Sequence, residues 1–254
     1  MVERTAHGNG ASKVMATLEI LSAADSRSPE GKTVAEVARA LVRDKSVISR
    51  QLRNLVDSGL VERDESGRFR LSWRLFTLMA QAGDQRLIRA GIPVLRVLAG
   101  TVRDRAHLSV VSGRQVLTVH TEGPTRSLQA VGWVGRLVPI WNTSSGIALI
   151  MGHTDEHICS LLDQLPDITT GRSKQIMRSI NEARKRGYSV ADGLFERDLM
   201  GIAAPVLDVH DRVVAAVNVS GPTFRVQPHL QAIAAHVVAA AKKLSDALTH
   251  FDTS

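Results

Sequence analysis

Residues 33–60 read TVAEVARALVRDKSVISRQLRNLVDSGL, and this stretch decides the fold of the first part of the chain. Thr33 and Glu36 have the spacing of a capping box, in which each side chain bonds the other residue's backbone N–H at a helix start. Apolar residues then recur at helical spacing, which predicts a first helix. After a short break, a second helix is predicted from about Lys45 to Ser58.

The predicted second helix has two different faces. One face is apolar and should pack on the first helix. A different stripe carries hydroxyls and arginines, and with the lysine at the helix start it comprises Lys45, Ser46, Ser49, Arg50 and Arg53. Arginine forks read guanine edges in the major groove, and hydroxyls reach bases or phosphates. The stripe is therefore a candidate DNA-reading surface, and the alternative is the solvated face of an ordinary amphipathic helix.

A β-hairpin is predicted directly after the two helices. Residues 60–63 and 68–71 mix apolar and basic side chains around a turn that contains Asp, Ser and Gly. Helix, break, helix and basic hairpin is the order of elements in a winged helix-turn-helix. In that fold Arg68 and Arg70 would contact phosphates, which position a protein on DNA without reading its sequence. The hairpin therefore favours DNA binding over the solvated-face alternative.

Composition limits the classes of protein that remain. The length of 254 residues is enough for two domains, and the net charge of +7 is spread over both halves of the chain. No apolar run is long enough to span a bilayer, and the N-terminus lacks the apolar core of a signal peptide. The single cysteine, Cys159, permits no internal disulfide and is expected in the core. These features favour a cytoplasmic protein with no membrane partner.

The second half of the chain reads as an α+β domain. Three strands are predicted at residues 105–110, 115–121 and 127–134, followed by three helices, three more strands and a closing helix. The expected fold is a mostly antiparallel sheet with helices against it. Upstream of this domain, an apolar helix with Trp73 and Phe76 on one side is expected to pack against another helix.

Nearly the whole chain, from about Ser12 to Leu248, resembles the IclR family of bacterial transcription factors. In the second half, GRLVPIWNTSSGIALI, RKRGYSVADG, GIAAPVLD and VVAAVNVSGPTFR stand in the family's order and spacing. The resemblance implies a winged helix-turn-helix that binds operator DNA, a linker helix and a GAF-like domain that binds a small effector. The implied boundaries are a disordered arm at 1–11, the winged helix at 12–72, the linker at 73–84 and the effector domain at 85–254.

The resemblance also implies how the protein assembles and acts. Family members commonly form homodimers or homotetramers, so a roughly palindromic operator is expected. Repression is the expected action, although the family also contains activators. The alternative is a sensor module that makes protein contacts only.

The resemblance places the effector pocket between the sheet and the loop-helix that follows it. The corresponding positions here are Ser144, Ser145, Ala191, Leu199, Gly201, Asn218 and Ser220. The chain departs from the family pattern at Ala191, where an acid is common, and at Asn218, where a hydroxyl is common. Hydroxyl, amide and helix N-terminal N–H groups bind anions without a buried charge, so a small carboxylate or aromatic acid is the expected effector. The alternative at each position is a capped helix or a satisfied strand residue.

Enzyme, cofactor and metal chemistry find no support in the sequence. The chain has no G-x-S-x-G, G-x-G-x-x-G or G-x-x-x-x-G-K motif, and nothing fixes a base for a serine nucleophile at Ser144 or Ser145. His153 and His157 have the spacing of metal ligands on a helix, but no third ligand accompanies them. We therefore expect no catalytic residue, no metal and no cofactor.

Overall fold

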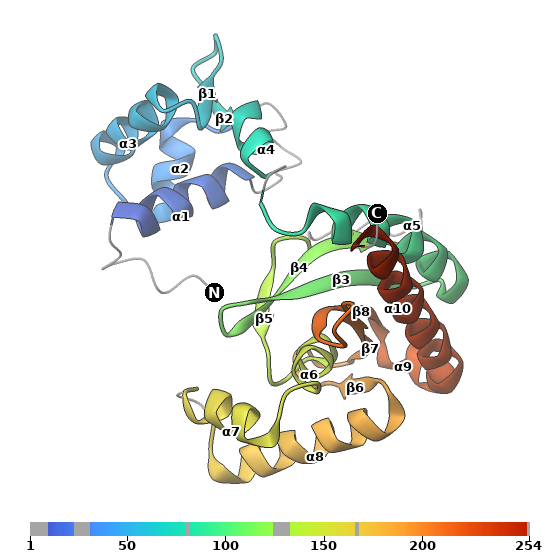
Figure 1. The fold of residues 1–254 in the computed structure, drawn as a ribbon. Helices are drawn as coiled ribbons and strands as arrows, with labels where there is room; N and C mark the ends of the chain where they lie inside the picture. Colours follow the sequence, from blue (N-terminus) through green and yellow to red (C-terminus); the bar gives the residue numbers. More distant parts are fainter. Residues whose placement is uncertain (1–9, 23–30, 80–81, 124–132, 166–167, 253–254) are drawn as a thin grey trace. The chain divides into compact units, whose positions relative to one another are not determined.

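The computed structural model describes residues 10–22, 31–79, 82–123, 133–165 and 168–252 (Figure 1). The chain divides into two compact units, residues 1–85 and 86–254. Among the helices in the described ranges, none has the length and apolar character needed to cross a bilayer.

The first unit contains three helices and a hairpin that share one core. Its elements are α1 (Gly10–Ser22), α2 (Val34–Leu41), α3 (Lys45–Asp57), β1 (Val61–Arg63), β2 (Phe69–Leu71) and α4 (Trp73–Met79). The predicted capping box is present at the start of α2, since the Glu36 N–H donates to Thr33 Oγ1 at 3.3 Å and the Thr33 N–H donates to Glu36 Oε2 at 2.6 Å. The two helices and the hairpin predicted from residues 33–71 are confirmed.

A tight turn joins α2 to α3. Val42 ends α2 in the left-handed conformation, with φ 51°, and its side chain is 91% exposed. A β-branched residue is rarely found there, because its Cβ crowds the neighbouring carbonyl. The turn lets Ile48 and Leu52 of α3 reach Val37 of α2, and all three side chains are fully buried.

Two predicted boundaries in this unit are wrong. Helix α1 begins at Gly10, so the last two residues of the predicted arm are helical, and residues 1–9 lie outside the described ranges. Helix α4 is shorter than the predicted linker at 73–84, because Gly83 adopts a left-handed φ of 66° and the chain around it is not helical. The side chain of Arg74 in α4 donates to the Ser58 carbonyl at 3.0 Å, which ties α4 to the winged part of its own unit.

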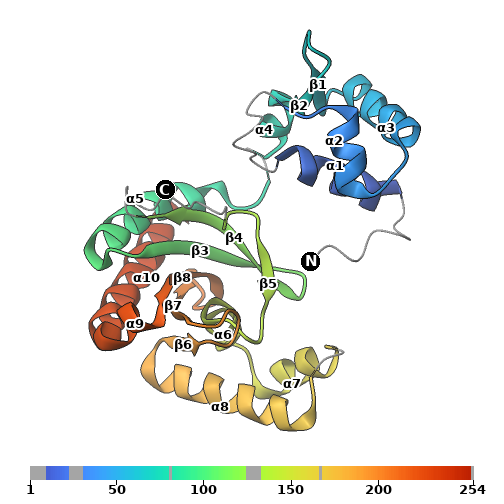
Figure 2. The same cartoon turned by 180° about the vertical axis from the view of Figure 1, so that it is seen from behind.

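The second unit is a six-stranded antiparallel sheet with helices on both faces (Figures 1 and 2). Its elements are α5 (Gln85–Val102), β3 (Arg105–Ser112), β4 (Gln115–Glu122), β5 (Leu137–Pro139), α6 (Ser144–Ile150), α7 (Asp155–Asp163), α8 (Thr170–Arg186), β6 (Ser189–Asp192), β7 (Leu199–Leu207), β8 (Val213–Pro222), α9 (Thr223–Val226), η1 (Gln227–His229) and α10 (Leu230–Asp252). The strand order is β5-β4-β3-β8-β7-β6. The predicted strand at 127–134 falls mostly outside the described residues, and β5 was not predicted.

The sheet separates two apolar cores. Alternate residues of β7 and β8, such as Ile202 and Val217, pack toward α5 and α10. Their neighbours Ala203 and Ala216 pack on the other face with α6, α7 and α8. Because helices cover both faces, a polar side chain on a central strand is buried and must find a partner inside the protein.

Candidate effector pocket and nucleic-acid interface

A cavity lies beside β3, β8 and the start of α6 in the second unit. The empty space between its lining residues is about 510 Å³, a figure that includes solvent at its open mouth. All seven predicted pocket residues line it: Ser144, Ser145, Ala191, Leu199, Gly201, Asn218 and Ser220. The sequence did not assign the remaining lining residues, which are His107, Ser109, Val116, Thr118, Trp133, Val138, Thr143 and Phe195.

The wall of the cavity formed by β3 and β8 is polar and buried. His107 pairs with Asn218 in the strand register, and its Nδ1 and Nε2 lie 2.9 Å from Thr121 Oγ1 and 2.9 Å from Ser220 Oγ. Burial, together with the smaller effect of the Arg105 charge, lowers the pKa of His107 to about 3. The imidazole is therefore neutral near pH 7, with one ring nitrogen donating to a hydroxyl and the other accepting from one.

The wall formed by α6 depends on close backbone packing. Thr143 caps the helix, because the Gly146 N–H donates to Thr143 Oγ1 at 3.1 Å. A Cβ at Gly146 would overlap the backbone carbonyl of Ile140. One of the N–H groups at the start of α6, that of Gly146, is therefore used by the cap; whether the N–H groups of Ser144 and Ser145 bind an anion stays a prediction.

An arginine joins two aromatic residues of the lining. The Arg136 guanidinium carbon lies 4.4 Å from the Trp133 ring centroid and 5.1 Å from that of Phe195. The same guanidinium donates to Glu196 Oε1 at 2.7 Å. Among the lining residues that the structure describes, none is Asp, Glu, Lys or Arg. The cavity therefore has an uncharged interior, with a paired arginine stacked on its aromatic wall.

The predicted DNA-reading face of α3 is accessible. Its residues Lys45, Ser46, Arg50 and Arg53 are exposed and Ser49 is half-buried, whereas the apolar face of α3 is buried against the rest of the unit. The structure thus places the basic and hydroxyl side chains together on one free surface of a well-packed helix.

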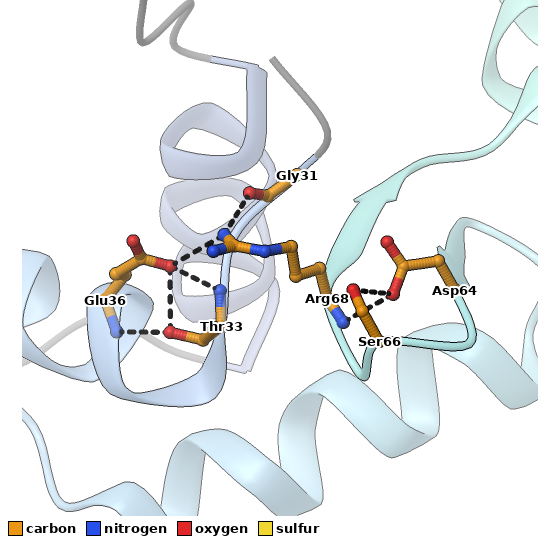
Figure 3. Close-up of polar contacts among 6 residues, drawn as sticks. All are labelled: Gly31, Thr33, Glu36, Asp64, Ser66 and Arg68. Carbon is orange, nitrogen blue, oxygen red and sulfur yellow. Dashed lines mark hydrogen bonds and ion pairs between the residues drawn. The ribbon is translucent and has the colours of Figure 1, made fainter. Parts of the chain in front are cut away.

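The two predicted wing arginines differ in their surroundings. Arg68 reaches back to the start of α2, where its guanidinium donates to the Gly31 carbonyl at 3.0 Å and lies 3.5 Å from Glu36 Oε2 (Figure 3). Its backbone N–H donates to Asp64 Oδ1 at 2.8 Å. Arg68 thus supports the wing within the unit, and its phosphate contact stays a prediction. Arg70 is 61% exposed beside Glu62, at 3.1 Å.

The Arg68 contact is linked to the helix cap. The backbone N–H and the hydroxyl of Thr33 both donate to Glu36, and these bonds, with the nearby charge of Arg68, lower the pKa of Glu36 (Figure 3). One carboxylate therefore caps α2 and also holds the hairpin against it.

Two minor expectations concern α7 and the residues directly before it. The His153 and His157 rings lie 4.6 Å apart, and no group of three metal-ligating side chains occurs in the part of the chain that the structure describes. Burial lowers the pKa of His153, as does the charge of His157. Cys159 is exposed, so its predicted core location is wrong: the buried face of α7 carries Ile158 and Leu162 instead.

Each of the two units matches a known protein family. Residues 79–246 match the family described as "Bacterial transcriptional regulator IclR C-terminal", and residues 15–77 match one described as HVO_A0114. Over 227 residues the chain is 26% identical to the HTH-type transcriptional regulator KdgR of Dickeya chrysanthemi, covering 86% of this chain and 74% of that one. It is 23% identical to the acetate operon repressor of Salmonella typhimurium over 222 residues, covering 84% and 81%.

A solved structure has a similar fold along the whole chain. An IclR homologue from Microbacterium hydrocarbonoxydans, complexed with 4-hydroxybenzoate, superposes with a TM-score of 0.75 at 23% identity, covering 94% of this chain and 98% of that one. These relatives and the two-unit structure define the class, a DNA-binding transcriptional regulator with a ligand-binding C-terminal domain, not an enzyme. The chain belongs to the IclR family of bacterial transcriptional regulators.

Proposed function

We propose that this protein is an effector-responsive repressor, acting in the cytoplasm, whose residues 12–72 form a winged helix-turn-helix. The observation that carries the proposal is the exposed face of α3, on which Arg50 and Arg53 stand free over a buried apolar face. In this proposal α3 enters the major groove, Lys45, Ser46 and Ser49 reach bases or phosphates near its start, and Arg70 contacts the backbone.

For the second unit we propose a small organic acid, aromatic or otherwise flat, as the effector. Trp133, Phe195 and Leu199 offer apolar surface, while the hydroxyls and amide of the opposite wall offer neutral hydrogen bonds. The Arg136 guanidinium, stacked on two lining rings, is the cation that we assign to the carboxylate. The complex of the Microbacterium homologue with 4-hydroxybenzoate supports an effector of this size.

We further propose a homodimer or homotetramer that binds a palindromic operator. Trp73 is 76% exposed and Phe76 is 57% exposed, and their rings meet edge to face at 5.9 Å on the surface of α4. Two large neighbouring aromatic side chains on an exposed face suit contact with a second copy of the chain. A symmetric dimer presents two α3 helices to two half-sites.

The test is fluorescence anisotropy of the purified protein on the DNA upstream of its own gene, beside a scrambled duplex, at two salt concentrations. Selective binding with a steep salt dependence is expected. Effector candidates are then added, and by linkage the operator must change effector affinity by the same factor as the effector changes operator affinity. Equal, weak binding to both duplexes, unchanged by Arg50→Ala, would favour a sensor without DNA binding. Activation in place of repression would appear in a reporter assay.

A further inference from the structure

One polar group of the cavity has no hydrogen-bond partner in the part of the chain that the structure describes. Asn218 lies on β8, lines the cavity and is 7% exposed, and its Oδ1 is buried without a hydrogen-bond donor among the described residues. A buried carbonyl left unpaired destabilises the folded state, and natural proteins rarely leave one so. One other such atom occurs in the described part, on Asn142, which does not line the cavity and donates its own amide to the Leu194 carbonyl.

The neighbours of Asn218 on the adjacent strands do not supply the donor. On β3 its register partner is His107, whose two ring nitrogens are both used by Thr121 and Ser220. On β7 its partner is Ala203, which has no polar side chain. The register partners of Asn218 on the two adjacent strands are therefore satisfied or apolar, and Asn218 itself belongs to the cavity lining.

We infer that the effector donates a hydrogen bond to Asn218 from an uncharged hydroxyl or N–H group. The inference rests on the proposed effector-binding function and narrows the class of effector. A carboxylate has no proton to donate, and its oxygens would repel the amide carbonyl in a wall that holds no cation. The effector is thus a hydroxylated or amino-substituted acid, with its donor against β8 and its carboxylate directed to Arg136.

The first test needs no ligand. Replacing a buried unpaired carbonyl by an apolar group removes its desolvation cost, so Asn218→Leu should raise the Tm of the free full-length protein by about 2–4 °C. Asn218→Ala, which is too small to clash, should leave the Tm unchanged or raise it. The matched control is Ser189→Ala, because Ser189 is also buried in the sheet but donates to the Ser144 carbonyl at 2.7 Å. That control should lower the Tm. A lower Tm in both Asn218 variants would overturn the inference, since Asn218 would then hold the fold together.

The second test compares probes that differ at one group. Calorimetry with 4-hydroxybenzoate, 4-aminobenzoate, 4-methoxybenzoate and benzoate separates a donor, an acceptor and neither at the same ring position. The two donors should bind at least about tenfold more tightly than the methyl ether or benzoate, and Asn218→Leu should reduce this ratio to about one. Tighter binding of 4-methoxybenzoate than of 4-hydroxybenzoate, or a ratio that Asn218→Leu leaves unchanged, would overturn the inference.

A failure of the proposed function can be distinguished from a failure of the inference about Asn218. If no probe binds and DNA is not bound selectively, the proposals of a DNA-binding regulator and of an aromatic effector are wrong. The Tm comparison still decides whether Asn218 is an unpaired group in the free protein. If DNA is bound selectively and the donor probes have no advantage, only the inference about Asn218 falls.

Discussion

The predicted DNA-reading face of α3 and the cavity differ in the surroundings of their polar side chains. On α3 the functional side chains are charged and hydrated, and the fold supplies only an apolar face that holds them in place. In the cavity the polar groups are neutral and mostly buried, and those of His107, Ser220 and Thr143 are bonded to other parts of the second unit. A surface can therefore exchange side chains with little effect on folding, whereas in the cavity recognition and stability depend on the same atoms.

The largest expected effect is a loss of stability when a residue of the cavity wall is substituted. Gly146→Ala places a Cβ against the backbone carbonyl of Ile140, which cannot move aside as a flexible side chain could. We expect a loss of about 4 kcal/mol or more in the free energy of unfolding, measured by urea denaturation.

The control for this substitution is Gly171→Ala in the first turn of α8, where no atom lies within 4 Å of the added Cβ. It should stabilise the protein slightly, by up to about 1 kcal/mol. Similar results for the two variants would show that α6 does not pack tightly on the preceding loop.

The next prediction tests, by varying the pH, whether His107 in the cavity wall is neutral in the folded protein. In the unfolded chain His107 takes up a proton near pH 6.5, but in the folded protein it does so only at about pH 3. The folded state binds fewer protons between these values, so stability is full above pH 6.5 and falls as the pH is lowered toward 3. The fall should approach about 1.4 kcal/mol per pH unit, on the order of 4 kcal/mol in total.

His107→Gln isolates this effect, since the difference between wild-type and variant unfolding energies should vary with pH only through His107. Chemical denaturation at a series of pH values measures it. A difference that is constant between pH 6.5 and 4 would mean that His107 is charged or accessible in the folded protein.

The third prediction concerns the exposed surface. Arg50→Ala should cost about 1–3 kcal/mol of operator affinity and relax selectivity at one base position, with little change in Tm, because Arg50 is exposed. Anisotropy on an operator and its single-base variants measures both effects. Lys242→Ala on α10 removes the same charge from an exposed site in the second unit and serves as the control. Equal losses of operator affinity in the two variants would mean that Arg50 contributes only its positive charge and reads no base.

The smallest expected effect separates the two wing arginines. Arg70→Ala should lower the slope of log affinity against log salt by about 0.9, as expected for one lost phosphate contact. Arg68→Ala should leave that slope unchanged and instead destabilise the first unit by about 1 kcal/mol, because its hydrogen bond to Gly31 is lost. If Arg68→Ala instead lowers the slope and leaves the stability unchanged, Arg68 contacts a DNA phosphate.

The sequence predicted local features well. The capping box at Thr33 and Glu36, the two helices and the hairpin each depend on residues a few positions apart. The seven cavity positions came from a resemblance to a family, and all of them line the cavity. Whether those residues bind an effector stays a prediction.

Features that depend on distant pairing were missed. His107 and Ser109 alternate with apolar residues, as on a strand with one solvated face, yet both are buried because helices cover the second face as well. A polar face on a strand of a sheet covered on both sides could have indicated the cavity. The hydrogen bond of Arg68 to the Gly31 carbonyl was missed for a similar reason, because Gly31 lies 37 positions away along the chain.

The position of Trp133 has a practical consequence in spectroscopy. The chain has three tryptophans: Trp133 lines the cavity 5.4 Å from the His107 ring, Trp73 is exposed on α4, and Trp141 lies under the Arg172 guanidinium at 4.1 Å. With Trp73 and Trp141 changed to Phe, the emission of the remaining indole would report on the cavity alone. The protein thus carries its own optical reporter, and an effector titration can be read without a label.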